Sequence, residues 1–374
     1  MATNNNNKAL NVPHLRFPEF SGEWNKCTIN DLATVVGGGT PDTTVKSYWG
    51  GDIQWFTPSE IGKNKYVDFS LRTITRDGLD NSSAKLLPLH TILLSSRATV
   101  GECSIASNEC TTNQGFQSLI AKQCNIDFLY YLIQTKKKDL IRNACGSTFL
   151  EISANEIRKI KVAVPVQNEQ EQIAKLLSLI DERIATQNKI IEKLETLIKG
   201  IIETVISSQK PNTLIKNCLE CNSSTLQESQ VAETGTFSVY GATGISGYTE
   251  TADINGESIL IIKDGSSVGI VKFVTGEYSY IGTLNSLIAK DGYCLKYIYF
   301  ALQRFSFEPY KTGMAIPHIY FKDYGKAKIY CPSLSLQTLI AQKLSLIENK
   351  MEVEKRIILC YQLQKSYLLS RMFI

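Results

Sequence analysis

The stretch QEQIAKLLSLIDERI at residues 170–184 returns, little changed, as QTLIAQKLSLIENKM at residues 337–351. Apolar residues in each copy recur at alternating steps of three and four, which is the a/d pattern of a coiled-coil helix. The first pattern continues to about residue 207 and the second to the end of the chain. The sequence therefore predicts two long amphipathic helices, one central and one C-terminal.

Each predicted helix needs a partner for its apolar stripe. Gln187 interrupts the first stripe and Glu354 interrupts the second at the equivalent position, with Lys365 as a further interruption. We expect the two stripes to pack on each other as an antiparallel coiled coil; the alternative is that each helix packs only on its own domain. The expected interface residues are Ile173, Leu177, Ile180, Ile184, Ile191 and Leu194 in the first helix and Ile340, Leu344, Ile347, Met351 and Ile358 in the second.

The repeat extends well beyond the two helices. Pro165 and Pro332 precede them at the same offset, and proline is tolerated at a helix start but not in its interior. The tetrapeptide SLIA occurs at residues 118–121 and again at residues 286–289. A period this long indicates a duplicated domain rather than a solenoid.

In both segments that precede the long helices, glycine, proline and threonine alternate with β-branched and aromatic residues, which predicts short strands and turns. We predict an α+β fold with two similar α/β globular domains, separated by two long helices and related by a pseudo-two-fold duplication. The expected segments are a disordered lead-in at 1–22, a first domain at 23–164, a central helix at 165–208, a second domain at 209–331 and a C-terminal helix at 332–374.

Composition is that of an ordinary soluble protein, with 43% hydrophobic and 20% charged residues over 374 positions. The chain has neither an apolar run of membrane-spanning length nor a signal-peptide pattern at its start, so we expect a cytoplasmic protein with no membrane partner. The net charge of +4 permits a nucleic-acid partner without requiring one. Cys218 and Cys221 form a lone C-x-x-C, and we expect ordinary reduced thiols and no metal site.

No catalytic constellation is apparent. The three histidines, His14, His90 and His318, lack metal-ligand spacing, and no G-x-S-x-G elbow is present. The glycine-rich loops lack the G-K-[ST] ending of a phosphate-binding loop and are expected to be turns. We therefore predict no catalytic residue and no cofactor in this chain.

Several blocks of the sequence resemble the specificity (S) subunit of Type I restriction-modification systems. The start LRFPEFSGEW (15–24) is similar to that family's usual opening. The stretches GGGTPDTTVKSYWGGDIQWFTPSEI (37–61), SSRATVG (95–101) and NQGFQSLIA (113–121) resemble blocks of its target recognition domains. The doubled P-x-x-x-x-Q-x-x-I-A helix start adds to the resemblance, which covers nearly the whole chain.

The resemblance implies a non-catalytic subunit that binds double-stranded DNA. Each target recognition domain would recognise one half of a bipartite, asymmetric site, and the two helices would set the spacer and dock the partner subunits. Two methylation subunits would bring S-adenosylmethionine and adenine-N6 methylation. Restriction subunits with motor and nuclease functions would bring ATP, magnesium and cleavage.

Candidate DNA contacts are basic and amide side chains in loops. Arginine and lysine bind phosphates or guanine, and asparagine and glutamine pair with adenine. The alternative for each is a solvated surface residue, and the nearby tryptophans are expected in the core. The candidates are Lys46, Arg72, Arg76, Arg97, Asn113, Gln114 and Gln117 in the first domain and Tyr240, Tyr248, Lys263, Lys272 and Lys311 in the second.

Two other classes of function are alternatives for this sequence. One is an autonomous DNA-modifying enzyme, which the missing cofactor and catalytic motifs oppose. The other is a coiled-coil scaffold that binds no DNA. The two globular domains argue against it, because a protein that acts only as a spacer needs no globular domains with different loops.

Overall fold

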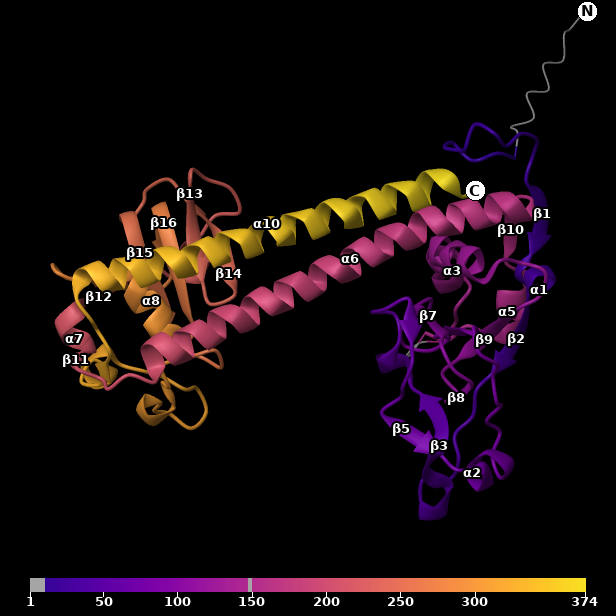
Figure 1. The fold of residues 1–374 in the computed structure, drawn as a ribbon, viewed down its shortest axis with the longest axis horizontal. Coiled ribbons are helices and arrows are strands. Elements are labelled where there is room, and N and C mark those ends of the chain that lie inside the picture. Colours follow the sequence, from indigo (N-terminus) through magenta and orange to yellow (C-terminus); the bar gives the residue numbers. More distant parts are fainter. Residues whose placement is uncertain (1–10, 147–149) are drawn as a thin grey trace, which may run out of the picture. The chain divides into compact units, whose positions relative to one another are not determined.

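The computed structural model describes residues 11–146 and 150–374 and divides the chain into two compact units (Figure 1). Unit 1 joins the N-terminal part of the chain, up to Gln187, with Ile357–Ile374. Unit 2 is the continuous segment Asn188–Arg356. Each long helix therefore belongs partly to one unit and partly to the other.

Three small sheets form the β structure of unit 1. Strands β1 and β10 pair antiparallel, a five-stranded sheet has the order β2-β9-β6-β7-β4, and a three-stranded sheet has the order β5-β3-β8. The strands are β1 (Asn25–Thr28), β2 (Ala33–Gly37), β3 (Trp49–Phe56), β4 (Tyr66–Val67), β5 (Arg72–Ile74), β6 (Ile92–Leu94), β7 (Cys103–Ala106), β8 (Cys110–Thr112), β9 (Gln117–Ala121) and β10 (Lys161–Val164).

Short helices complete unit 1, and the most deeply buried of them is α3. Its residues Phe128–Ile133 are almost fully buried and join one hydrophobic core with strands of the five-stranded sheet. The same core includes Ile173 and Leu177 of the central helix. The short helices are α1 (Ile29–Leu32), α2 (Arg76–Asp80), α3 (Ile126–Thr135), α4 (Lys137–Arg142) and α5 (Ala154–Lys159).

Unit 2 is built around one six-stranded sheet with the order β12-β17-β15-β16-β13-β14, and a separate pair joins β11 to β18. Its buried helix α8 packs on the sheet as α3 does in unit 1. The elements are β11 (Thr213–Leu214), α7 (Ile215–Cys218), β12 (Leu219–Ser223), β13 (Phe237–Gly241), β14 (Gly244–Thr249), β15 (Ile254–Ile262), β16 (Val271–Tyr280), β17 (Leu284–Ala289), α8 (Leu295–Gln303), α9 (Phe321–Tyr324) and β18 (Lys328–Ile329).

The predicted duplication and fold class are confirmed. In unit 1 the strand β9 is followed by α3, α4, α5 and the short strand β10, and then by the central helix. In unit 2 the buried strand β17 is followed by α8, α9 and β18, and then by the C-terminal helix. The two globular domains are α/β units of one plan, and each leads into a long helix.

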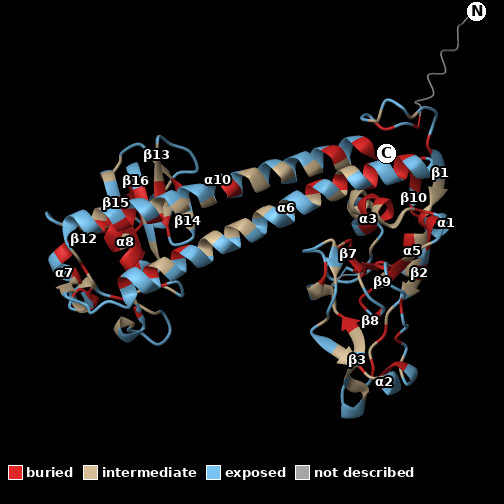
Figure 2. Cartoon of the chain, viewed as in Figure 1, coloured by how far each residue is buried: buried red, intermediate tan, exposed pale blue. Residues whose placement is uncertain are grey.

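The two long helices are α6 (Gln167–Ile202), which continues as a π-helical segment Glu203–Ser207, and α10 (Leu334–Met372). In unit 1 the beginning of α6 packs on the end of α10, where Leu368 and Met372 share a core with Ile173. In unit 2 the end of α6 packs on the beginning of α10. In each unit the two helices therefore run antiparallel. The buried residues of α6 lie towards its two ends, with none between Ile180 and Ile198 (Figure 2). Within the described residues, no helix is long and apolar enough to span a membrane.

Burial varies along the predicted seam. Five of the expected interface residues are buried, and the other six are half-buried. The buried residues are Ile173, Leu177, Ile180, Ile340 and Leu344, and the half-buried ones are Ile184, Ile191, Leu194, Ile347, Met351 and Ile358.

The two charged residues of the seam find partners inside their own units, whereas the Oε1 of Gln187 is buried without a hydrogen-bond partner among the described residues. In unit 1, Lys365 of α10 forms an ion pair with Asp181 of α6 at 2.7 Å between Nζ and Oδ1. In unit 2, the carboxylate of Glu354 is buried and pairs with Lys350 one turn earlier. A buried charge without a partner would cost several kcal/mol, so these pairs make the interruptions tolerable.

A buried glutamine at the start of each long helix ties that helix to its globular domain. The Nε2 of Gln170 donates to the Pro165 carbonyl at 3.0 Å, and its Oε1 accepts from the backbone N–H of Asn125, the N-cap of α3, at 3.0 Å. Gln337 repeats the arrangement, with the Pro332 carbonyl at 2.8 Å and the N–H of Cys294 at 3.0 Å. In each copy of P-x-x-x-x-Q, the glutamine therefore links the long helix to the proline before it and to the start of the buried shorter helix. We call this hydrogen-bonded contact the clamp.

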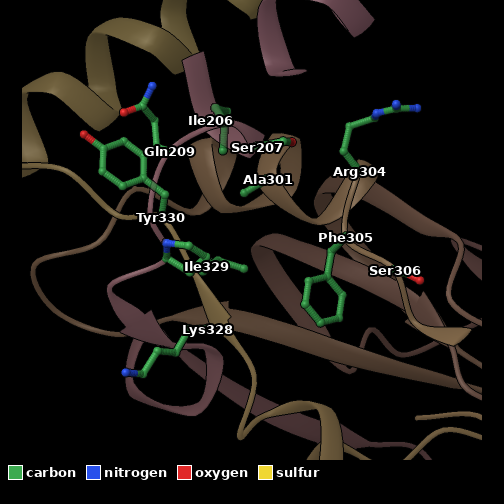
Figure 3. A pocket seen from close by; sticks show the side chains of 11 residues that line it. Ile206, Ser207, Gln209, Ala301, Arg304, Phe305, Ser306, Lys328, Ile329 and Tyr330 are labelled. Carbon is green, nitrogen blue, oxygen red and sulfur yellow. The ribbon is translucent and has the colours of Figure 1, made fainter. Parts of the chain in front are cut away.

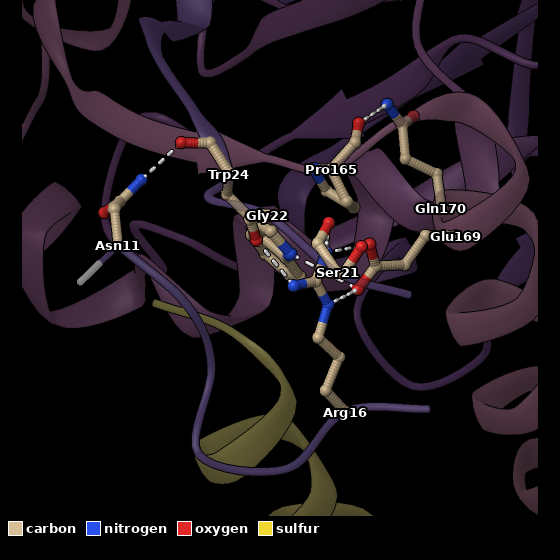
Figure 4. Close-up of polar contacts among 8 residues, drawn as sticks. All are labelled: Asn11, Arg16, Ser21, Gly22, Trp24, Pro165, Glu169 and Gln170. Atoms are coloured by element: carbon tan, nitrogen blue, oxygen red, sulfur yellow. Dashed lines mark hydrogen bonds and ion pairs between the residues drawn. The ribbon is translucent and has the colours of Figure 1, made fainter. Parts of the chain in front are cut away.

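Residues 11–22, which the sequence groups with a disordered lead-in, pack on unit 1, while residues 1–10 lie outside the described part. Arg16 pairs with both carboxylate oxygens of Glu169 at 2.7 Å, and Trp24 Nε1 donates to Glu169 at 3.3 Å (Figure 4). The backbone N–H of Leu15 donates to the Arg371 carbonyl of α10. The segment therefore covers the start of α6, where Glu169 is fully buried.

We expect Gln170→Leu to lower the free energy of unfolding by about 2–4 kcal/mol, because the Pro165 carbonyl and the Asn125 N–H both lose a buried partner. Urea unfolding followed by circular dichroism measures the effect. Gln172→Leu, an exposed position on the same turn, is the matched control and should stay within about 0.5 kcal/mol of the original chain. Equal stability of the two variants would contradict the clamp.

Candidate nucleic-acid interface

Three of the predicted DNA-contacting residues of the first domain line a single pocket. Arg97 lies in the loop after β6, and Asn113 and Gln114 lie in the loop after β8. Backbone hydrogen bonds hold the two loops together, from Ser96 N–H to the Gly115 carbonyl at 2.8 Å. The lining residues are Pro58, Arg97, Ala98, Asn113, Gln114 and Gly115.

The Arg97 loop has a constrained backbone. Ala98 has a φ of 63°, a left-handed conformation that costs a non-glycine residue free energy, and its N–H donates to the Leu150 carbonyl at 3.1 Å. The Arg97 side chain is half exposed, and its Nε lies 3.8 Å from Oε2 of Glu151. The loop therefore projects the guanidinium beside a carboxylate at the rim of the pocket.

Both amide side chains of the pocket have their oxygens engaged. Asn113 Oδ1 accepts the backbone N–H of Gly115 at 2.8 Å, which closes the loop on itself. Gln114 Oε1 accepts a hydrogen bond from the Thr40 hydroxyl. The loop is also anchored to β3, since the Asn113 N–H donates to the Phe56 carbonyl at 3.0 Å.

A second cluster of unit 1 is built around Arg72 on β5. Its guanidinium carbon lies 3.6 Å from the ring centroid of Trp49 and 5.4 Å from that of Trp55. Trp55 is buried and Trp49 is half-buried, and the two rings meet edge to face at 5.0 Å. Arg72 therefore lies against an aromatic pair and is still exposed to solvent.

The other candidates in unit 1 lie outside these two clusters. Lys46 is exposed on a short 3-10 turn before β3. Arg76 is exposed on α2 and pairs with Asp80 one turn later. Gln117 is half-buried on β9, and its Oε1 is buried without a hydrogen-bond partner among the described residues.

In unit 2, Lys272 and Tyr240 lie together. The Lys272 ammonium is 4.6 Å from the ring centroid of Tyr240, which in turn meets Tyr278 edge to face. Tyr248 lies on the neighbouring strand β14, and its backbone pairs with Ala232. These side chains belong to the β13–β14–β16 end of the six-stranded sheet.

Lys263 and Lys311 occupy different loops of unit 2. Lys263 directly follows β15 and is fixed through its backbone, since its N–H donates to the Thr283 carbonyl and its carbonyl accepts from Ile319. Lys311 follows a 3-10 turn and pairs with Glu308 of that turn. Both are half-buried, so neither extends freely into solvent.

The Arg97 loop of the first domain and the Asp264 loop of the second have equivalent backbone hydrogen bonds. The bond from Ala98 N–H to the Leu150 carbonyl has its counterpart in the bond from Gly265 N–H to the Pro317 carbonyl. The second domain has Asp264 at the position equivalent to Arg97 and His318 at the position equivalent to Glu151. Oδ1 of Asp264 lies 2.7 Å from Nδ1 of His318. This shared backbone frame carries a cationic donor in the first domain and a carboxylate in the second.

Two further pockets escaped the sequence analysis, because their residues come from the ends of elements far apart in the chain. In unit 2, Arg304 after α8 and Lys328 of β18 line a pocket beside the π-helical segment (Figure 3). In unit 1, Lys136 after α3 and Lys161 of β10 line a pocket beside Ile374. In the sequence, the only sign that these two pockets are equivalent is the offset of 167 residues between Lys161 and Lys328.

The C-x-x-C pair has the properties of buried thiols. Burial raises the pKa of Cys221 to about 11, so the thiol stays protonated at neutral pH. Cys218 lies in the hydrophobic core of unit 2. Among the residues that the structure describes, no group of three or more histidine, cysteine or acidic side chains is arranged to hold a metal ion.

The model of the family "Type I restriction modification DNA specificity domain" matches residues 21–196 and 215–359. The chain is 39% identical over 183 residues to the Type I restriction enzyme MjaIX specificity subunit of Methanocaldococcus jannaschii, a match covering 46% of this chain and 42% of that protein. It is 29% identical over 175 residues to the EcoR124I/EcoR124II specificity subunit of Escherichia coli, covering 45% of this chain and 43% of that protein. Each match thus spans less than half of the relative's length.

A crystal structure of the S subunit of a Type I restriction-modification system from M. genitalium has the same fold, with a TM-score of 0.66. The alignment covers 97% of this chain and 99% of that one at 19% sequence identity.

We expect Arg72→Gln to lower the free energy of unfolding by about 0.5–1 kcal/mol, because the cation–π contact with Trp49 is lost. Urea unfolding followed by tryptophan fluorescence reports on the same cluster. Arg76→Gln, which removes an equal charge from an exposed helix pair, should change stability by less than about 0.5 kcal/mol. An equal loss in both variants would mean that the aromatic pair does not hold Arg72.

Proposed function

The chain belongs to the family of Type I restriction modification DNA specificity domains, and we propose that it is the DNA-specificity subunit of a Type I restriction-modification complex. Each globular domain recognises one half of a bipartite, asymmetric DNA site. The observation that carries this proposal is the shared backbone frame with exchanged side chains, Arg97 in one domain and Asp264 in the other. Two readers of different half-sites require a constant scaffold and variable polar loops.

The polar clusters of the loops are the proposed DNA contacts. Base edges are read by hydrogen-bonding side chains, which the Arg97 pocket supplies, and phosphates by lysine and arginine. The remaining sequence candidates are proposed as positioning contacts to the backbone. A modest net charge of +4 suits a subunit whose DNA affinity depends partly on its partners.

The long helices are proposed to set the spacing between the half-sites and to dock two methylation subunits. Apart from the seam, α10 carries a second apolar column at intervals of seven residues. Leu339, Leu346 and Val353 of this column are between 49% and 63% exposed. The equivalent positions of α6 include the polar Gln172 and Thr186. An exposed apolar column on one helix is suited to a partner helix of the methylation subunits.

The chemistry of the complex is assigned to the partners. Methylation subunits would supply S-adenosylmethionine and adenine-N6 transfer, and restriction subunits would supply ATP hydrolysis, magnesium and cleavage. This division is supported by the lack of any catalytic motif in the sequence. The complex would act on DNA in the cytoplasm.

We expect the purified chain alone to bind DNA without methylating or cutting it. Incubation with labelled S-adenosylmethionine should give no transfer, and adding the methylation subunit should create modification at one split, asymmetric site. Methyl transfer by the isolated chain would overturn the assignment, and so would modification at unrelated sequences.

We also expect the two helices to act as a ruler. Inserting one heptad after Gln187 and one after Glu354 keeps both seams in register and lengthens the pair by roughly 10 Å, at ~1.5 Å per residue. Since DNA rises ~3.4 Å per base pair, the spacer should grow by about three pairs while both half-sites stay the same. Sequencing of the modified sites measures the length of the spacer and the sequence of both half-sites.

The matched control has the heptad inserted in α6 alone. This shifts the apolar residues of α6 relative to those of α10, so it should abolish modification. An unchanged spacer in the double insertion, or altered half-sites, would refute the ruler.

A further inference from the structure

We propose that the pocket formed by Arg97, Asn113 and Gln114 recognises a guanine through its major-groove edge. The inference rests on the proposed function, that the first domain reads DNA, and it adds which base this pocket selects. The argument depends on which atoms of the three side chains remain available to a ligand.

Most of the available groups are N–H donors, because each amide oxygen already accepts one hydrogen bond. Asn113 cannot present its amide the other way round, because the backbone N–H of Gly115 needs an acceptor and takes Oδ1 at 2.8 Å. Gln114 Oε1 accepts from the Thr40 hydroxyl. In the part of the chain that the structure describes, the amide N–H groups of these two residues donate to no protein atom, and Arg97 has only donors to offer.

Guanine is the base that best matches a surface rich in donors. In the major groove it presents two acceptors, N7 and O6, whereas adenine presents an acceptor and a donor, cytosine a donor and thymine an acceptor beside a methyl group. An adenine amino group would face the N–H groups of the pocket. The proposal therefore departs from the adenine pairing that the amide residue types suggest by themselves.

A neutral base fits the pocket better than a phosphate, which is the other acceptor-only ligand of DNA. Glu151 lies 3.8 Å from Arg97 and would repel a phosphate while it offsets the guanidinium charge. Pro58 and Ala98 add apolar wall to the pocket, which suits the face of a flat ring. Arginine beside a carboxylate keeps its planar fork of donors for a bidentate contact with N7 and O6.

The second domain supports the role of this position in specificity. On the same backbone frame it carries Asp264, an acceptor, where the first domain carries Arg97. The frame and its hydrogen bonds are retained while the polarity of the side chain is reversed. A residue that served only the scaffold would not need this reversal.

The test is selection of bound duplexes from a random DNA library by the full chain together with its methylation subunit. The original chain should select a first half-site that contains guanine at one position. Arg97→Lys keeps the charge and loses the planar fork, so its preference for that guanine should fall about tenfold or more, with the rest of the site unchanged. Arg142→Lys, an exposed residue of α4, is the matched control and should leave the selected site intact.

A second variant inverts the hydrogen-bonding polarity of the pocket. Gln114→Glu replaces two donors by an acceptor and should select against guanine at the same position, while Gln123→Glu places the same charge on an exposed site and should not. Uniform weakening across all sequences, with an unaltered site, would identify a phosphate contact and overturn the proposal. An unchanged site at full affinity would overturn it too. If the original chain selects no sequence, the proposed function itself fails. If it selects a site that the variants leave unchanged, only the guanine proposal fails.

Discussion

The amide of a buried glutamine is the contact on which the rest of the architecture depends. Gln170 links the residue before α6, the start of α3 and the helix itself, and Gln337 does the same for α10. Because both amide ends are used and both side chains are buried, the direction in which each helix leaves its domain is fixed at its first turn. The seam between the helices can then be imperfect, with half-buried and charged positions, without loss of that direction.

This rigidity leaves the recognition loops free to vary. The loops of Arg97 and Asp264 are held through backbone atoms, so their side chains can change without disturbing the frame. Arg72 shows the opposite arrangement, since its position depends on the tryptophan rings beneath it. A change of specificity is therefore expected to be easier in the pocket loop than on the three-stranded sheet.

The duplication, the two helices and the fold class were predictable because heptads and prolines are local sequence patterns, and each occurs twice in the chain. The last turns of α6 were less so. The sequence pattern places apolar residues at Ile201 and Val205, whereas Ile202 and Ile206 are the buried residues, and the second of them lies in a π-helical segment. The left-handed Ala98 was not predictable either. Its conformation is imposed by a hydrogen bond to a segment some fifty residues away, and periodicity carries no trace of such contacts. The candidate DNA contacts remain predictions for the same reason.

The division of the chain into units has a consequence for biosynthesis. Unit 2 is continuous and has its complete sequence once Arg356 has been translated. Unit 1 contains residues on both sides of unit 2 in the sequence, and its core includes Leu368, Met372 and Phe373 of the later segment. The domain that leaves the ribosome first is thus the one that finishes folding last. Until Ile357–Ile374 has been translated, the apolar surface of unit 1 stays open, so a nascent chain is prone to aggregate even after unit 2 has been made.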